Sequence, residues 1–181
     1  MKKKIGNTLA LYPTPLVVVG AMVNGKPNWV LVGHLGIMGH DHLLISLAKA
    51  HYTNQGIRET GVLSVNAVDE ALLRRADYVG CVSGSKTDKS GVFPDYPARS
   101  GAPVLEEAKI SMACRVEDNY ELPGFDNFIL TIDETFAEEG ILTSAGKPDY
   151  RRFHPVLFEM PGYTYLKTGD TIGNCMKLEQ E

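Results

Sequence analysis

The clearest pattern near the start of the chain is a pair of apolar runs joined by a turn signal. Residues 16–23 read LVVVGAMV, and a second apolar run, WVLV, begins at Trp29. The first run is rich in β-branched side chains, which favour a pleated strand. Asn24-Gly25 stands between the runs and supplies the positive φ angles that a two-residue hairpin turn requires. The pattern predicts a β-hairpin, preceded by a loose, extended arm at residues 1–15.

The segment after this hairpin combines a further strand with a short helix. HLLISLA, at residues 42–48, is apolar enough for a buried strand, and residues 33–41 form a loop rich in glycine and histidine before it. Residues 54–60 then predict a short helix that Gly61 can close in the left-handed conformation. VLSVNAV predicts the strand that follows.

A second helix is predicted from Asp69 onward, because its carboxylate can cap the first turn. The apolar side chains that recur at helical spacing are Leu72, Leu73, Ala76 and Val79. A loop of sequence SGSKTDKSG and a long irregular connection with three prolines come next.

The second half of the chain returns to strands. KISMACRVED and FDNFILTIDETF both alternate between apolar and polar positions, and NYELPG forms a turn between them. The side chains expected on the apolar faces are Ile110, Met112, Cys114 and Val116 in the first run and Phe128, Leu130 and Ile132 in the second. VLFEM and YTYLKTG, near the end, predict two short strands separated by Pro161-Gly162.

Many strands, few helices and an initial hairpin indicate a mainly β fold. We expect a closed or nearly closed antiparallel β-barrel with short helices laid across it. The length of 181 residues fits one domain that spans residues 1–181.

Composition and charge narrow the classes of protein. A hydrophobic fraction of 44% and a charged fraction of 22% are typical of a soluble globular protein. The net charge of -4 argues against a nucleic-acid partner, which needs a basic surface. LVVVGAMV is too short to span a bilayer, and Pro13 and Pro15 interrupt the stretch that would otherwise resemble a signal peptide. Three distant cysteines without a CxxC pair favour a reducing, cytoplasmic setting with no membrane partner.

Familiar catalytic motifs are absent from the sequence. It has no GxSxG, GxGxxG or GxxxxGK[ST] segment, which argues against a serine hydrolase, a Rossmann cofactor site and a P-loop. His40-x-His42, with His34 nearby, admits a metal site because imidazole is a common zinc ligand. No carboxylate or cysteine stands at a spacing that would complete such a site. We therefore expect no metal, and histidines that lie at the surface or against a ligand.

Two polar clusters could instead hold a phosphomonoester, because each combines hydroxyl and backbone donors with lysine. Taken alone, either cluster is typical of a solvated loop. The first consists of Ser46, Lys49, His51, Tyr52 and Thr53, and the second of Ser83, Ser85, Lys86, Thr87, Asp88 and Lys89.

Together and in this order, these features resemble the flavin reductase-like family, the FMN-binding split barrels, and most closely its flavoredoxin branch. The similarity rests on PLVVVGAMVNGKPNWVLVGHLGIMG and LLISLAKAHYTNQGIRETGVLSVN. DYVGCVSGSKTDKSG and the closing HPVLFEMPGYTYLKTGDTIGNCMKL extend it over nearly the whole chain.

The resemblance implies a six-stranded Greek-key barrel that forms a homodimer and holds FMN near the subunit interface. It assigns contacts with the flavin ring to Asn28 and to the run Val32, Gly33, His34 and Leu35. It assigns the phosphate to Lys49, Tyr52 and Thr53, with His51 and Ser46 in the same cluster, and to Lys89 from the distant loop. A late aromatic side chain that packs on the flavin is Phe158, Tyr163 or Tyr165.

The sequence also departs from the family pattern. His34 stands where an aromatic residue is common, HDHLL replaces an Asp-Pro-Pro segment, and Asp126-Asn127 replaces a histidine of some relatives. These changes concern the surroundings of the ring, so the electron donor stays open.

The chemistry implied by the resemblance belongs to the cofactor rather than to catalytic side chains. A flavin carries the hydride or electrons while the protein binds and orients it, and backbone amides of residues 34–38 would stabilise the charge of the reduced ring. The leading hypothesis is an FMN-dependent oxidoreductase that takes electrons from NAD(P)H, as a transient co-substrate, or from another donor, and passes them to a small-molecule or protein acceptor. The alternatives are a barrel that binds FMN or another small ligand without catalysis, and a histidine-based metal protein.

Overall fold

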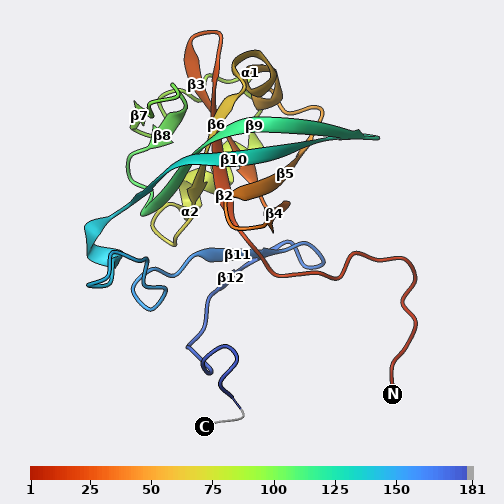
Figure 1. Ribbon diagram of the computed structural model, residues 1–181. Helices are drawn as coiled ribbons and strands as arrows, with labels where there is room; N and C mark the ends of the chain where they lie inside the picture. Colours follow the sequence, from red (N-terminus) through yellow and green to blue (C-terminus); the bar gives the residue numbers. More distant parts are fainter. Residues whose placement is uncertain (179–181) are drawn as a thin grey trace.

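Antiparallel strands dominate the secondary structure of the protein, for which a computed structural model describes residues 1–178 (Figure 1). Two short α-helices and one 3-10 helix, η1, accompany the strands. The elements in chain order are β1 Thr14–Pro15, β2 Val17–Val23, β3 Lys26–Val32, β4 Leu35–Met38, β5 His42–Ala48, α1 Thr53–Thr60, β6 Val62–Ala67, α2 Leu73–Cys81, β7 Asp95–Pro97, β8 Pro103–Leu105, β9 Ile110–Leu122, β10 Phe125–Ala137, η1 Glu139–Ile141, β11 Val156–Glu159 and β12 Thr164–Lys167.

The main sheet has the strand order β3-β2-β6-β9-β10-β5-β4. Its two edge strands are consecutive in the chain, because β3 ends at Val32 and β4 begins at Leu35. Two linking residues span roughly 10 Å at most, so the sheet must curl until its edges meet. The amide of Ser46 in β5 donates to the carbonyl of His34 in the link at 2.9 Å. The mainly β, barrel-like class expected from the sequence is confirmed.

This sheet has seven strands, whereas the resemblance implies six and the sequence pattern assigns residues 33–41 to a loop. The additional strand is β4, which folds back on β5 with Met38 opposite His42. Gly39 adopts a φ of 72° in the tight turn between them. A glycine in this left-handed conformation allows the reversal without the steric penalty that a side chain would add.

The predicted hairpin is confirmed as β2 and β3. Asn24 and Gly25 have φ angles of 50° and 76°, as the two-residue turn requires. The second strand begins earlier than the apolar pattern indicates, since Lys26 already pairs with Val23.

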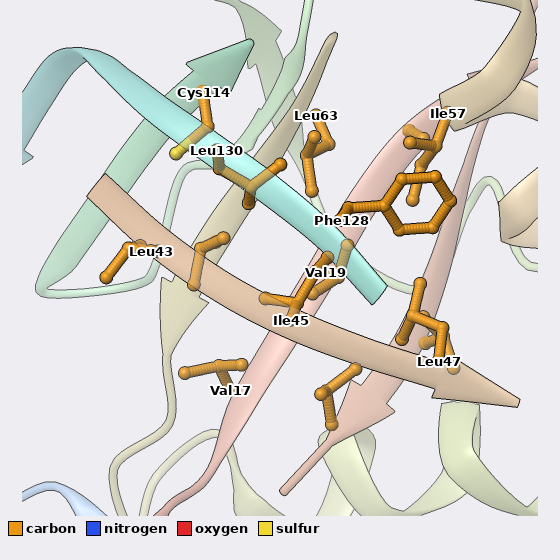
Figure 2. Close-up of a cluster of buried hydrophobic side chains, with 14 residues drawn as sticks. Val17, Val19, Leu43, Ile45, Leu47, Ile57, Leu63, Cys114, Phe128 and Leu130 are labelled. Carbon is orange, nitrogen blue, oxygen red and sulfur yellow. The ribbon is translucent and has the colours of Figure 1, made fainter. Parts of the chain in front are cut away.

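The core inside the curled sheet is built from inward-facing side chains of six strands, β2, β3, β5, β6, β9 and β10, and from Ile57 of α1 (Figure 2). Met112, Cys114 and Val116 of β9 face this core as predicted, but Ile110 packs with Ile141 and Phe153 in a separate cluster. Ile110 is the first residue of β9, and the segment after β10 that contains Ile141 and Phe153 covers it there.

Both predicted helices are present: α1 contributes Ile57 to the core inside the sheet, whereas α2 packs in a separate cluster with Val18 and Trp29. α1 ends at Gly61, which is left-handed at a φ of 69°. Asp69 accepts a hydrogen bond from the Leu72 amide at 3.1 Å and so caps the turn that precedes α2. The short ribbon of β7 and β8 was not predicted, because its prolines mask the strand pattern.

The terminal segments form a second, smaller sheet in the order β1-β11-β12. β1 anchors the end of the N-terminal arm, while the first residues of that arm extend away from the barrel (Figure 1). The predicted strands VLFEM and YTYLKTG are confirmed as β11 and β12. They lie under the point where β3 passes into β4, and they provide the aromatic side chains of that region.

Gly20 tests the packing between β2 and the single tryptophan. A Cβ added to Gly20 would lie 2.3 Å from the Trp29 ring. We expect Gly20→Ala to lower the free energy of unfolding by about 1–3 kcal/mol, as overpacking does. Gly91→Ala is the matched control, because a Cβ added there has no neighbour within 4 Å. Urea titration followed by tryptophan fluorescence measures both variants, and equal midpoints would contradict this packing.

Candidate functional site

A cavity of about 480 Å³ opens where β3 ends and where β5 and the β11-β12 pair approach it. It brings together six residues that the sequence assigns to cofactor binding: Val32, Gly33, His34, Ser46, His51 and Tyr163. The remaining lining side chains are largely apolar or aromatic. We call this space the large cavity.

Phe158 forms one wall of the large cavity and lies directly on the backbone of Gly33. A Cβ added to Gly33 would be 2.7 Å from the Phe158 ring, so this contact requires a glycine. The rings of Tyr163 and Tyr165 lie 6.1 and 6.2 Å from the Phe158 ring. The three aromatic residues among which the sequence could not choose therefore line one space together.

Tyr165 is fixed at the rim of this cavity. Its hydroxyl donates to Asp77 of α2 at 2.5 Å. Burial, together with this carboxylate, raises the pKa of Tyr165, which keeps the phenol protonated. Tyr163 is by contrast 77% exposed and has a positive φ of 52°, so it covers the cavity from outside.

A second, more polar cavity of about 340 Å³ lies beside the first helix. Asn28, Tyr52 and Lys89 contribute to its walls. The Asn28 amide donates to the Thr53 hydroxyl at 2.7 Å, and both side chains are buried. This groups Asn28 with the predicted phosphate residues rather than with the residues of the large cavity.

Gly84 lets the distant loop approach this polar cavity closely. A Cβ at position 84 would lie 2.2 Å from the Asn28 side-chain oxygen and 2.7 Å from the Tyr52 ring. The loop is thus packed against the cluster that the sequence predicts for phosphate, although about 30 residues separate them in the chain. The sequence identified the loop but not the importance of Gly84, because a glycine is required there only through its contact with the distant Asn28 and Tyr52.

Lys89 is a buried cation, only 4% exposed. Its ammonium donates to the carbonyls of Val79 and Val82 at 3.0 and 3.1 Å, at the C-terminal end of α2. An ammonium carries three N–H donors, so one further hydrogen bond is available to a ligand. Burial lowers the pKa of Lys89 to about 8. A bound anion would favour the charged form of this side chain.

His51 lines the large cavity, and the next residue, Tyr52, lines the polar cavity. The pKa of His51 is lowered by burial and then by the positive charge of Lys89. The two predicted parts of the site therefore adjoin at these two residues. A ligand with an apolar ring system and an anionic tail could span them.

Lys49 does not line the polar cavity, but it lines a further pocket together with His51 and Tyr52. Its ammonium pairs with Glu121 and lies 3.6 Å from a carboxylate oxygen of Asp126. Asp126 is completely buried and also binds Arg58 at 2.6 Å and the Asn54 amide at 2.7 Å. This carboxylate ties the start of β10 to the helix that begins with Thr53, and the contact of Lys49 with a phosphate stays a prediction.

Leu35 lies outside the large cavity and contributes to a neighbouring apolar groove. Residues 35–38 form strand β4, so part of their amides pairs with β5 instead of facing a ligand. Only Gly33 and His34 remain in the link to present their backbone to the large cavity. Phe125 and Met160 also line the large cavity, and the sequence did not predict them there because they come from segments far apart in the chain.

The histidines do not gather into a metal centre in the part of the chain that the structure describes. His34 is hydrogen-bonded to Tyr12, and His42 to Asp41 and Thr131. Among residues 1–178, no three or more His, Cys, Asp or Glu side chains are arranged to hold a metal ion. No helix of this part of the chain is long and apolar enough to cross a membrane.

A curled antiparallel sheet with an aromatic-walled cavity at its open seam, next to a buried lysine, defines a split barrel. A family model described as "Flavin reductase like domain" matches residues 9–159. The chain therefore belongs to the flavin reductase-like family.

Solved structures support this assignment. A flavoredoxin from Methanosarcina acetivorans is 35% identical with a TM-score of 0.95, over 99% of this chain and 98% of that one. Flavoredoxin of Desulfovibrio vulgaris (Miyazaki F) is 29% identical with a TM-score of 0.91, over 99% and 100%. An FMN-binding protein from Thermus thermophilus, at 20% identity and a TM-score of 0.82 over 96% and 100%, shares the fold. Comparison with curated proteins finds no match.

Asp126 provides a test of how α1 is positioned. We expect Asp126→Asn to lower the free energy of unfolding by about 1–3 kcal/mol, because two cations lose a buried partner. Asp133→Asn on the same strand is the control, since Asp133 is partly exposed and pairs with Arg115 at 2.8 Å. The control should change the unfolding free energy by less than about 1 kcal/mol. Urea titration measures the free energy of unfolding of both variants. Equal losses of stability would show that Asp126 contributes no more than an ordinary partly exposed ion pair.

Proposed function

We propose that this protein is an FMN-binding oxidoreductase of the flavin reductase type. The observation that carries the proposal is that His51 lines the aromatic-walled large cavity while its neighbour Tyr52 lines the polar cavity that contains the buried Lys89. FMN has the matching shape and charge, a flat ring system joined to a phosphate. Family membership and the flavoredoxin structures support the same cofactor.

The residues present fit this cofactor. A volume of about 480 Å³ is within the range of small-molecule and cofactor sites. The backbone of Gly33 and His34, with Phe158 and Tyr163, would hold the ring. Lys89, with Thr53 and Asn28 behind it, would hold the phosphate, because charge-assisted hydrogen bonds to phosphate oxygens are strong.

A bound flavin supplies the hydride and electron transfer. The protein's residues bind and orient it, and the aromatic side chains of β11 and β12 exclude water from one side of the cavity. The short link between β3 and β4 offers backbone dipoles to the ring at fixed positions. No side chain of the site needs to act as a general acid or base for electron transfer.

NAD(P)H is the proposed electron donor, as a transient co-substrate, and a small molecule or a protein accepts the electrons. The competing possibility is a barrel that binds FMN without catalysis. Anaerobic mixing of the FMN-loaded protein with NADH and with NADPH distinguishes them by bleaching of the flavin absorbance. A flavin that stays oxidised with both nucleotides would remove NAD(P)H as the donor.

We also propose a homodimer. The outer edge of β4 has a free strand edge, and Ile37 and Met38 on it are 84% and 40% exposed. Exposed apolar side chains on a free edge favour association with another chain. Sedimentation velocity should give twice the 19.8 kDa mass of the chain. A species with the 19.8 kDa mass of one chain at micromolar concentration would contradict the homodimer.

Lys89 is the sharpest test of the cofactor proposal. Protein supplied with FMN should be yellow after removal of free flavin. We expect Lys89→Ala to weaken FMN binding by about 10- to 150-fold, since a charge-assisted contact contributes roughly 1.5–3 kcal/mol. Quenching of flavin fluorescence measures the dissociation constant.

Lys147→Ala is the matched control, because Lys147 is an exposed lysine that lines neither cavity. It should change FMN affinity by less than about threefold. The free energy of unfolding of the FMN-free variants shows whether Lys89→Ala destabilises the protein by removing the contacts of Lys89 with α2. The FMN affinity of the folded variant then reports the loss of the phosphate contact. An unchanged affinity in a folded Lys89→Ala protein would remove this lysine from the site.

A further inference from the structure

A third space adjoins the large cavity on the side of the N-terminal arm. This groove has a volume of about 390 Å³ and shares Gly33, His34, Ser46 and Phe125 with the large cavity. Its other walls come from the arm, from β4 and β5, and from the tip of the β9-β10 hairpin. They consist mainly of leucines: Leu9, Leu11, Leu35, Leu44 and Leu122.

One polar pair stands in this apolar groove. The Tyr12 hydroxyl and Nε2 of His34 are hydrogen-bonded at 3.0 Å. When Nε2–H donates to the Tyr12 oxygen, the Tyr12 O–H donates to Met160 Sδ at 3.5 Å, a weak acceptor that a ligand oxygen in the groove can replace. His34 thus lies at the boundary between the groove and the large cavity. The Tyr12 hydroxyl adds a second polar group on the side of the groove.

The pair is held in place from several directions. Thr14 donates to the carbonyl of Gly33 at 2.7 Å, and β1 pairs with β11, so the arm is fixed next to Tyr12. The Tyr12 ring also packs edge-on against Phe158 at 6.3 Å. A hydrogen-bonding group fixed in an apolar space is the arrangement by which small-molecule sites orient a ligand.

The lining of the groove indicates what kind of molecule it takes. None of the described residues around it is a lysine, arginine, aspartate or glutamate. A dinucleotide would leave its phosphates without a cation there, which excludes it as the occupant. A neutral, largely apolar molecule with a hydrogen-bond-accepting oxygen matches both the leucine walls and the tyrosine hydroxyl.

We propose that this groove is the subsite for the electron acceptor and that it binds small neutral quinones, with a quinone oxygen accepting a hydrogen bond from the Tyr12-His34 pair. This role as acceptor subsite rests on the proposed function, because the ring would occupy the adjoining large cavity. The shared residues Gly33 and His34 place the two ligands side by side. His34, which replaces an aromatic residue common in the family, thereby acquires a function in choosing the acceptor.

Two substitutions test the subsite. Tyr12→Phe removes the hydroxyl and keeps the ring. Gly36→Leu fills the groove, because a Cβ added to Gly36 meets no atom within 4 Å and this glycine lines the space. Tyr150→Phe, at an exposed tyrosine that lines neither space, is the control for the loss of a hydroxyl.

The probe is duroquinone, whose fully substituted ring does not add the thiols of exposed Cys81 and Cys175. Calorimetric titration into oxidised FMN-loaded protein measures its affinity, and durene is the matched hydrocarbon without oxygens. We expect tighter binding of duroquinone than of durene, about three- to tenfold weaker duroquinone binding in Tyr12→Phe, and at least about tenfold weaker binding in Gly36→Leu. Tyr150→Phe should bind duroquinone as the unaltered protein does.

FMN affinity, measured separately by fluorescence, should stay within about twofold in each variant. Duroquinone binding that is absent, or that Gly36→Leu leaves unchanged, would overturn the subsite while leaving FMN binding intact. If the protein binds no FMN, the proposed function fails, and the same titration of the FMN-free protein still decides whether the groove binds the quinone.

Discussion

The two-residue link between β3 and β4 is the constraint on which the rest of the structure depends. Gly33 and His34 join the two edge strands of a seven-stranded sheet, so that sheet has to curl. The curling brings the end of β5 beside the end of β3, and the His34-Ser46 hydrogen bond fixes this approach. The large cavity exists because the edge strands β3 and β4 meet here without a continuous ladder of backbone hydrogen bonds between them. Closing the sheet and forming the site are therefore one structural event.

The same link sets the chemistry around the cavity. Gly33 has to be a glycine, because Phe158 occupies the position that its Cβ would need. His34 faces the neighbouring groove, where it meets Tyr12. The positive charge of the site comes from Lys89, which lies in the loop after α2. Its ammonium donates hydrogen bonds to carbonyls at the C-terminal end of that helix. The apolar part of the site belongs to the barrel. The end of the site that carries the buried cation depends on a loop packed against the barrel through Gly84.

Much of this arrangement could be predicted from the sequence where the signals are local. Asn24-Gly25, Gly61 and the alternation of Phe128 with Leu130 each depend on near neighbours, and each gave the right element. β4 was missed because its partner strand decides its conformation, and β7 and β8 because prolines interrupt their pattern. The resemblance named residues that the structure gathers around two adjoining cavities, although Leu35 lines the neighbouring groove and Lys49 lines a further pocket with His51 and Tyr52. Tyr12, Phe125 and Gly84 could not be found, because their roles come from contacts between distant segments.

The central claim is that one ligand spans both cavities, with its ring at Gly33-His34 and its phosphate at Lys89. Comparing FMN with riboflavin, which has the same ring and no phosphate, tests it most directly by amide NMR and by affinity. Both ligands should shift the amide signals of Gly33 and His34, and FMN alone should shift that of Lys89. Riboflavin should bind about 10- to 150-fold more weakly, as the loss of a charge-assisted contact predicts. Equal affinities, or shifts that leave the β3-β4 link untouched, would contradict the account.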